Sequence, residues 1–269
     1  MKITKAFAGV FLVTFLIGYA SVLPTKRTPA PDKSEKVDLR AQNYHDFSKP
    51  SVETKVEQKT PEEVVDWKEE DDSKFKIKLL ETGEGFHGDQ IKAKSGETWL
   101  GLFKENDNYF LRPAKIKISR AQDEKNVSVA GKNKPIFLLK NANMLHEGKI
   151  KTLFHNSSDE NLTSLENGFV AEYQLNDKKY TLRVEGGANS SKLILETENA
   201  GQLLYSVDKM GDATWNLVWV GDLDGDGKLD LYADLTDFYN FSERRLFLSS
   251  QAEKGKLVRQ IANFWTNGC

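Results

Sequence analysis

The sequence predicts an all-β fold, a sandwich or a barrel, for residues 75–269 of this 269-residue chain. Three observations support the prediction. From Phe75 onward, short segments of alternating apolar and polar residues follow one another. Turn signals rich in Gly, Asn and Asp separate them at intervals of about 8–12 residues, and the periodicity of amphipathic helices is nearly absent.

Residues 1–20 have the composition of a secretory signal peptide, with two lysines before an apolar run that begins at Ala6. Gly18 and Ala20 are small residues at the two positions that a signal peptidase reads, so we expect cleavage after Ala20. The alternative is an uncleaved membrane anchor, because the run extended to Leu23 reaches 18 residues. In either form the bulk of the chain is expected outside the cytoplasm, periplasmic or secreted, or anchored in the membrane and facing outward.

Residues 21–74 are predicted to be a disordered linker or stalk. Five of the seven prolines lie here, apolar residues are sparse, and the acidic cluster 69–72 comes near the end. Such a segment cannot bury enough apolar surface to offset the entropy that its chain would lose on folding.

The remaining residues are expected to form two β subdomains, 75–152 and 153–269, divided by the polar loop 153–168, although a single β domain stays open. The segment 114–119 (AKIKIS) has one apolar and one basic face, as a half-buried strand does. Other expected strands are 75–79, 98–103, 135–140, 169–175, 179–185, 192–198 and 202–207. A hairpin loop at 199–201 is expected to join the last two.

Composition excludes several classes of function. Lys and Arg number 38 against 40 Asp and Glu, a net charge of −2, so the basic excess of a nucleic-acid-binding domain is missing. The one cysteine, Cys269, rules out an internal disulfide and a thiolate metal cluster, and leaves pairing with another chain as an option. Neither a zinc-type HExxH motif nor a GxSxG nucleophile motif occurs, so no catalytic residue is predicted.

One segment carries clear chemistry, the loop DLDGDGKLD at 222–230. Its carboxylates occupy loop positions 1, 3, 5 and 9: Asp222, Asp224, Asp226 and Asp230. Calcium takes six to eight oxygen ligands, and alternate residues of a tight loop can point at one centre. We expect the carbonyl of Lys228 to turn inward while its side chain points to solvent, and Asp230 to close the shell directly or through water. Gly225 and Gly227 permit the sharp turn.

This loop resembles the calcium loops of EF-hand, dockerin and FG-GAP/VCBS-type repeats, which share the core D-x-D-x-D-G-x-x-D. An EF-hand needs flanking helices and a glutamate at position 12, where this chain has Ala233. Because 215–221 and 231–235 look like strands, the resemblance is closest to the FG-GAP/VCBS type, and it implies a Ca²⁺ loop joining two strands. The loop occurs once, so we do not expect a complete propeller, which needs at least four blades.

The surroundings of the loop also resemble uncharacterised exported bacterial proteins that carry a single such loop. Together these features predict an exported, calcium-binding β-rich module of the cell envelope or periplasm, with a binding or structural role. Its expected partner is an envelope protein or a glycan. The alternative is a secreted hydrolase, for example a glycan-directed one, in which the calcium site is structural.

Overall fold

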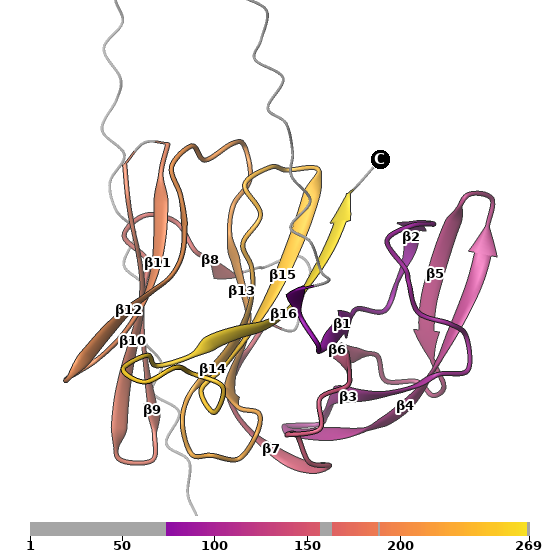
Figure 1. Ribbon diagram of the computed structural model, residues 1–269, viewed down its shortest axis with the longest axis horizontal. Helices are drawn as coiled ribbons and strands as arrows, with labels where there is room; N and C mark the ends of the chain where they lie inside the picture. The colour runs from indigo at the N-terminus through magenta and orange to yellow at the C-terminus, as the bar shows by residue number, and fades with distance from the viewer. Residues whose placement is uncertain (1–73, 157–162, 188, 268–269) are drawn as a thin grey trace, which may run out of the picture. The chain divides into compact units, whose positions relative to one another are not determined.

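The computed structural model describes residues 74–156, 163–187 and 189–267, which form sixteen strands in two sheets (Figure 1). The prediction of an all-β fold with sandwich- and barrel-like parts is therefore confirmed. The expected signal peptide, nearly all of the expected stalk and Cys269 lie outside the described residues. Among the residues described, no helix is long and apolar enough to span a bilayer.

Twelve strands form one strongly curved sheet that nearly closes into a barrel. Its main path runs through β1 (Lys78–Leu80), β6 (Pro135–Lys140), β3 (Thr98–Glu105), β4 (Asn108–Ala121), β7 (Gly148–His155), β13 (Asn216–Asp222), β14 (Asp230–Asp234), β15 (Phe241–Leu248) and β16 (Arg259–Asn267). Three further strands lie off this path: β5 (Glu124–Val129) pairs with β4 and with β2 (Gly83–His87), and β8 (Thr163–Ser164) pairs with β13. The end strands β1 and β16 contact each other at a seam, and next to it the side chain of Gln90, after β2, donates a hydrogen bond to Asn267 on β16.

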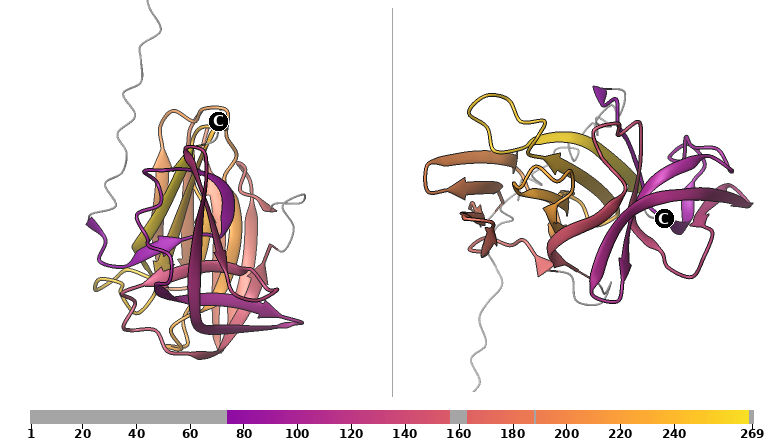
Figure 2. Two further views of the ribbon diagram at one scale, coloured as in Figure 1. Left: turned by 90° about the vertical axis from the view of Figure 1, so that its right-hand side faces the viewer. Right: turned by 90° about the horizontal axis from the view of Figure 1, so that it is seen from below.

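The second sheet is an antiparallel meander of four strands: β9 (Val170–Leu175), β10 (Lys178–Glu185), β11 (Ser191–Thr197) and β12 (Ala200–Val207). These strands match the four segments expected between 169 and 207. The register pairs Thr197 with Ala200, so the predicted hairpin between the last two strands is present. Figure 2 shows the meander beside the strands of the large sheet that lie late in the sequence.

Strands β13 to β15 contribute side chains to two hydrophobic cores, because successive side chains of a strand point to opposite faces of the sheet. On one face Trp219, Tyr232 and Leu246 lie in the core of the barrel. On the other face Leu217, Leu231 and Phe247 join the core shared with the four-stranded sheet. The molecule thus combines a barrel with a sandwich, and β13–β15 form the common wall.

The expected boundary at residue 152 falls inside β7. This strand pairs with β4 on one side and with β13 on the other. Strands from both sides of the boundary therefore belong to one sheet. The segment 153–168, expected as a polar loop, contains the end of β7 and the short strand β8, which pairs with β13.

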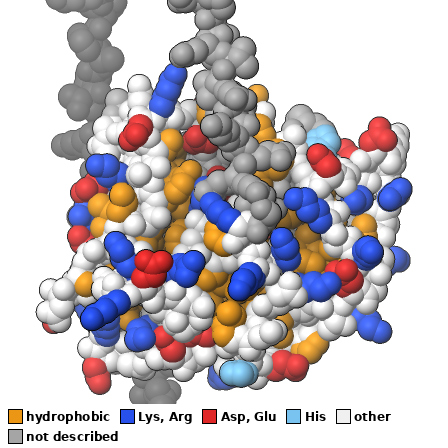
Figure 3. Space-filling model, in the orientation of Figure 1, with side chains coloured by type: hydrophobic (Ala, Val, Ile, Leu, Met, Phe, Trp, Pro, Cys, Tyr) orange, Lys and Arg blue, Asp and Glu red, His pale blue; other side chains and the backbone are white. Residues whose placement is uncertain are grey.

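The described residues fall into two sequence regions of opposite net charge. Residues 74–156 contain sixteen Lys and Arg against nine Asp and Glu, a balance of +7. The described residues from 163 to 267 contain eleven against sixteen, a balance of −5. Figure 3 shows Lys and Arg side chains spread over the part of the surface that contains β3 to β6.

Candidate metal centre

The acidic loop connects β13 to β14, two antiparallel neighbours of the common wall, and Gly221 at its base is paired with Asp230. Gly225 and Gly227 have φ angles of 76° and 78°, in the left-handed region that side chains resist. The sharp turn expected from these two glycines is therefore present, and the loop joins two strands.

Asp222, Asp224 and Asp226 each bring one carboxylate oxygen within 4.8 Å of the other two. Two oxygens of this group, Oδ1 of Asp222 and Oδ2 of Asp224, are buried and have no hydrogen-bond partner. Asp222 is only 9% exposed. A buried carboxylate oxygen without a hydrogen-bond partner lowers the stability of the folded protein. A cation bound between the three carboxylates would supply the missing partner.

Backbone hydrogen bonds orient the same carboxylates. The N–H of Gly227 donates to Oδ2 of Asp222 (3.1 Å), and the N–H of Asp226 donates to Oδ1 of Asp224 (3.2 Å). Each of these two side chains therefore uses one oxygen to hold the loop and leaves the other available. The loop is shaped before any ligand binds, which lowers the entropy cost of binding.

The carboxylate of Asp226 contacts Ser249 and the ammonium of Lys228, and the sequence predicted neither contact. The hydroxyl of Ser249, directly after β15, donates to Oδ1 at 2.9 Å. The ammonium of Lys228, whose side chain is 54% exposed, lies 3.1 Å from Oδ2, and this pairing raises the pKa of Lys228. Lys228 therefore folds back onto the acidic cluster, and a metal ion would compete with its charge for Asp226.

Asp230 is completely buried and both of its oxygens accept backbone hydrogen bonds. Its Oδ2 accepts from the N–H of Leu223 and its Oδ1 from the N–H of Ser249, each at 2.7 Å. The three mutually close carboxylates do not include it. In this geometry Asp230 ties the loop to the end of β15.

Burial raises the pKa of Asp230 well above its usual value, and the charge of Asp224 adds to the effect. Burial is also the largest cause of the raised pKa of Asp222, and the charges of Asp224 and Asp226 raise it further. Crowded carboxylates thus disfavour their own ionised forms, which a divalent cation would reverse.

A residue outside the predicted set, Asn176, links the loop to the second sheet. It lies in the turn between β9 and β10, and its amide nitrogen donates to the carbonyl of Gly227 (3.0 Å). Its amide oxygen accepts from the ammonium of Lys151, on β7, at 3.1 Å. The Asn-Asp turn is visible in the sequence, but nothing in it indicates this contact.

Comparisons with known proteins add no assignment: no protein-family model, curated protein or solved structure matches the chain. The chemistry of the site is therefore argued from its own geometry.

Proposed function

We propose that the chain is an exported calcium-binding β module of the cell envelope or periplasm, in which Ca²⁺ fixes the 222–230 loop and the protein has a binding or structural role. Export rests on the composition of residues 1–20. The observation that carries the calcium proposal is the pair of buried oxygens without partners, on Asp222 and Asp224, beside the carboxylate of Asp226.

Calcium suits this donor set better than magnesium does. Hard carboxylate oxygens on a loop rich in glycine can adjust to six to eight ligands, with the Lys228 carbonyl and water completing the shell. Magnesium demands a strict octahedron and keeps its own waters. Because position 12 is Ala233, a bidentate glutamate is missing, and we expect a Kd on the order of 10⁻⁴–10⁻³ M.

The contacts of the loop support a clasp-like role for the cation. Ser249 connects the loop to β15, and Asn176 connects it to the β9–β10 turn. An ion that fixes the loop would therefore stabilise the junction between the barrel and the four-stranded sheet. In this proposal the cation has a structural role, and the module binds its ligand at a surface away from the 222–230 loop.

Thermal melts in EDTA, calcium and magnesium test the proposal. Calcium at ten times its Kd should stabilise the protein by about 1.4 kcal/mol, because only the folded chain presents the site. Magnesium should have a much smaller effect. Asp224→Ala should abolish the gain, since it removes one available oxygen and breaks only one short-range hydrogen bond.

The matched control is Asp123→Ala, which removes an exposed carboxylate from the turn between β4 and β5. It should keep the full response to calcium. Equal melting temperatures in all three conditions would show that the loop is only an acidic turn, and would overturn the proposal.

A further inference from the structure

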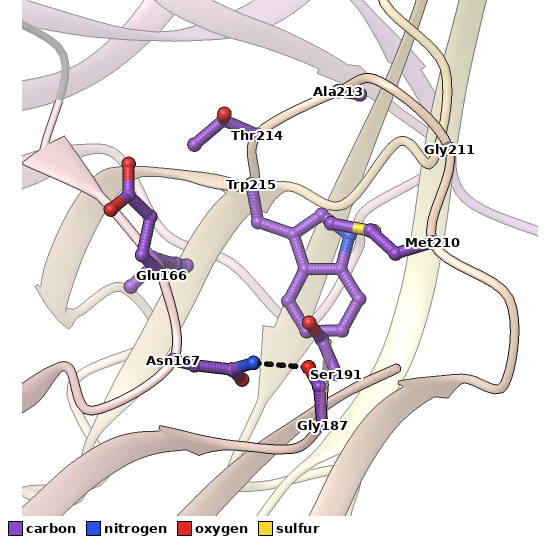
Figure 4. A pocket seen from close by; sticks show the side chains of 10 residues that line it. Glu166, Asn167, Gly187, Ser191, Met210, Gly211, Ala213, Thr214 and Trp215 are labelled. Atoms are coloured by element: carbon purple, nitrogen blue, oxygen red, sulfur yellow. Dashed lines mark hydrogen bonds between the residues drawn. The ribbon is translucent and has the colours of Figure 1, made fainter. Parts of the chain in front are cut away.

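A pocket of about 350 Å³ lies next to the start of β13, whereas the metal loop follows its end. This volume is at the lower limit for small-molecule sites. Three parts of the chain meet around it: residues 165–167 after β8, Gly187 after β10 with Ser191 at the start of β11, and residues within 210–215 before β13. Figure 4 shows Glu166 and Asn167 on one side, Met210 and Gly211 on the other, and Trp215 between them.

The chemistry of the lining indicates the kind of ligand. Its polar side chains are a carboxylate, an amide, two hydroxyls and an indole N–H: Glu166, Asn167, Ser191, Thr214 and Trp215. No Lys or Arg is among the ten residues that line it, so an anion would meet only the negative charge of Glu166. Mixed donors and acceptors without a cation favour a neutral ligand that has several hydroxyl groups.

Trp215 supplies the second, independent observation. Its side chain is completely buried, and its Nε1–H has no hydrogen-bond partner. Buried indole N–H groups usually have an acceptor, because an unpaired donor keeps its desolvation penalty. The ring itself packs against Tyr205 with centroids 5.4 Å apart, and Figure 4 shows the indole nitrogen on the side of Met210, which also lines the pocket.

The pocket walls are held in place before a ligand binds. The amide of Asn167 donates to the carbonyl of Gly187 at 2.7 Å, and the N–H of Gly211 donates to the carbonyl of Asp237 at 3.0 Å. A Cβ on Gly211 would lie 2.3 Å from that same carbonyl oxygen, so only glycine allows this approach. Preorganised walls of this kind favour binding of a small ligand.

We propose that this pocket binds a neutral polyhydroxyl ligand, a free monosaccharide or the terminal residue of a glycan, with Trp215 Nε1–H donating to a ligand oxygen. The inference rests on the proposed binding role of the module and gives that role a ligand class. The metal loop is a separate site that contributes no residue to the pocket.

The test is isothermal titration of the purified protein with glucose, galactose, mannose and N-acetylglucosamine, with glucuronate and glucose 6-phosphate as anionic counterparts. At least one neutral sugar should bind, and the anionic ones should bind at least tenfold more weakly. Titration with short oligosaccharides of the sugar that binds distinguishes a free monosaccharide from the terminal residue of a glycan. Tighter binding of the oligosaccharide identifies a glycan end, and equal or weaker binding identifies the free sugar.

Trp215→Phe keeps an aromatic ring and removes the donor, so affinity should fall at least tenfold. Trp265→Phe, at a tryptophan outside the pocket that stacks on Phe241, should bind as the wild type does. Asn167→Ala and Glu166→Gln, at positions nearer the surface, provide the same test if Trp215→Phe fails to fold. The absence of binding by every neutral sugar, or wild-type affinity in all three pocket variants, would overturn the inference.

The Asp224→Ala melts report on the metal loop alone. Failure of the sugar titrations therefore leaves the calcium proposal standing, and a failed calcium response leaves the pocket result intact.

Discussion

Asp222 and Asp230 begin and end the acidic loop with the same functional group, yet their surroundings differ. Asp222 keeps one buried oxygen without a partner, while both oxygens of Asp230 accept backbone N–H groups. The spacing of the aspartates predicts the loop and its turn, since both depend on local sequence. The difference between the two residues depends on Ser249, nineteen positions further along the chain, and no local pattern reveals it.

A half-buried histidine makes the stability of the protein depend on pH. Burial, and to a lesser degree the charge of Lys104, lower the pKa of His155 to about 4, and its Nδ1 lies 3.2 Å from the hydroxyl of Tyr109. The unfolded chain takes up this proton near pH 6.5, before the folded chain does. The stabilisation is complete above about pH 6.5 and is lost as the pH falls towards 4, by about 1–3 kcal/mol, because solvent screens a half-buried group.

Urea denaturation between pH 4 and pH 7 measures this effect. His155→Gln, which cannot titrate, should flatten the pH dependence relative to the wild type. His146→Gln, at an exposed histidine between β6 and β7, should keep the wild-type profile. Equal slopes for His155→Gln and the wild type would contradict the prediction.

At the scale of elements, β13 and β7 approach each other closely at a glycine. A Cβ on Gly221 would lie 2.4 Å from the carbonyl oxygen of Lys151 and 2.5 Å from the ring of Trp219. Gly221→Ala should therefore destabilise the protein by about 1–3 kcal/mol, because backbone or core must move. Chemical denaturation in urea measures the loss.

Gly201→Ala in β12 is the matched control. Its Cβ would meet Glu196 at an ordinary 3.6 Å, so stability should stay within about 0.5 kcal/mol of wild type or rise slightly. Equal stability of the two variants would show that the common wall is loose enough to absorb a methyl group at Gly221.

Most strands follow from the sequence because alternation reports burial on one face. The region 153–168 does not follow. The end of β7, Leu153 to His155, is only partly buried and shows no alternation, and β8 consists of two partly buried polar residues. They are strands because they pair with the edge of β13 that β14 does not occupy. Such pairing is not visible in the pattern of polar and apolar residues. By contrast β14 is buried at all five positions, and the apolar residues at its centre, Leu231 to Ala233, already indicate a strand covered on both faces.

At the scale of the molecule, the class of the fold is predictable but its pairing order is not. Alternation shows which face of a strand is apolar, whereas the choice of neighbour depends on contacts between distant segments, such as β1 with β6 and β7 with β13. The contact between Asn176 and Gly227, and the pocket around Trp215, are products of that same packing.

Every strand in the described residues lies between Lys78 and Asn267, so these residues should form a protease-resistant unit. If the chain is exported as proposed, we expect it to start at Ser21. We also expect limited proteolysis to trim it to a fragment that begins near Phe75, because the composition of residues 21–74 predicts a segment without a core. Fractionation, N-terminal sequencing and mass spectrometry check both points. Full-length protein in the cytosol, or resistance to cleavage within 30–70, would contradict them.

The short strand β1 has a mechanical consequence. It is the first strand of the barrel and pairs with β6 through only three residue pairs, while its other edge meets β16 at the seam. A pull transmitted along the chain from residues before Lys74 would load this strand first. With so few ladder bonds to share the load, β1 should peel from β6 at low force, while the longer strands of the wall that carries the acidic loop remain paired.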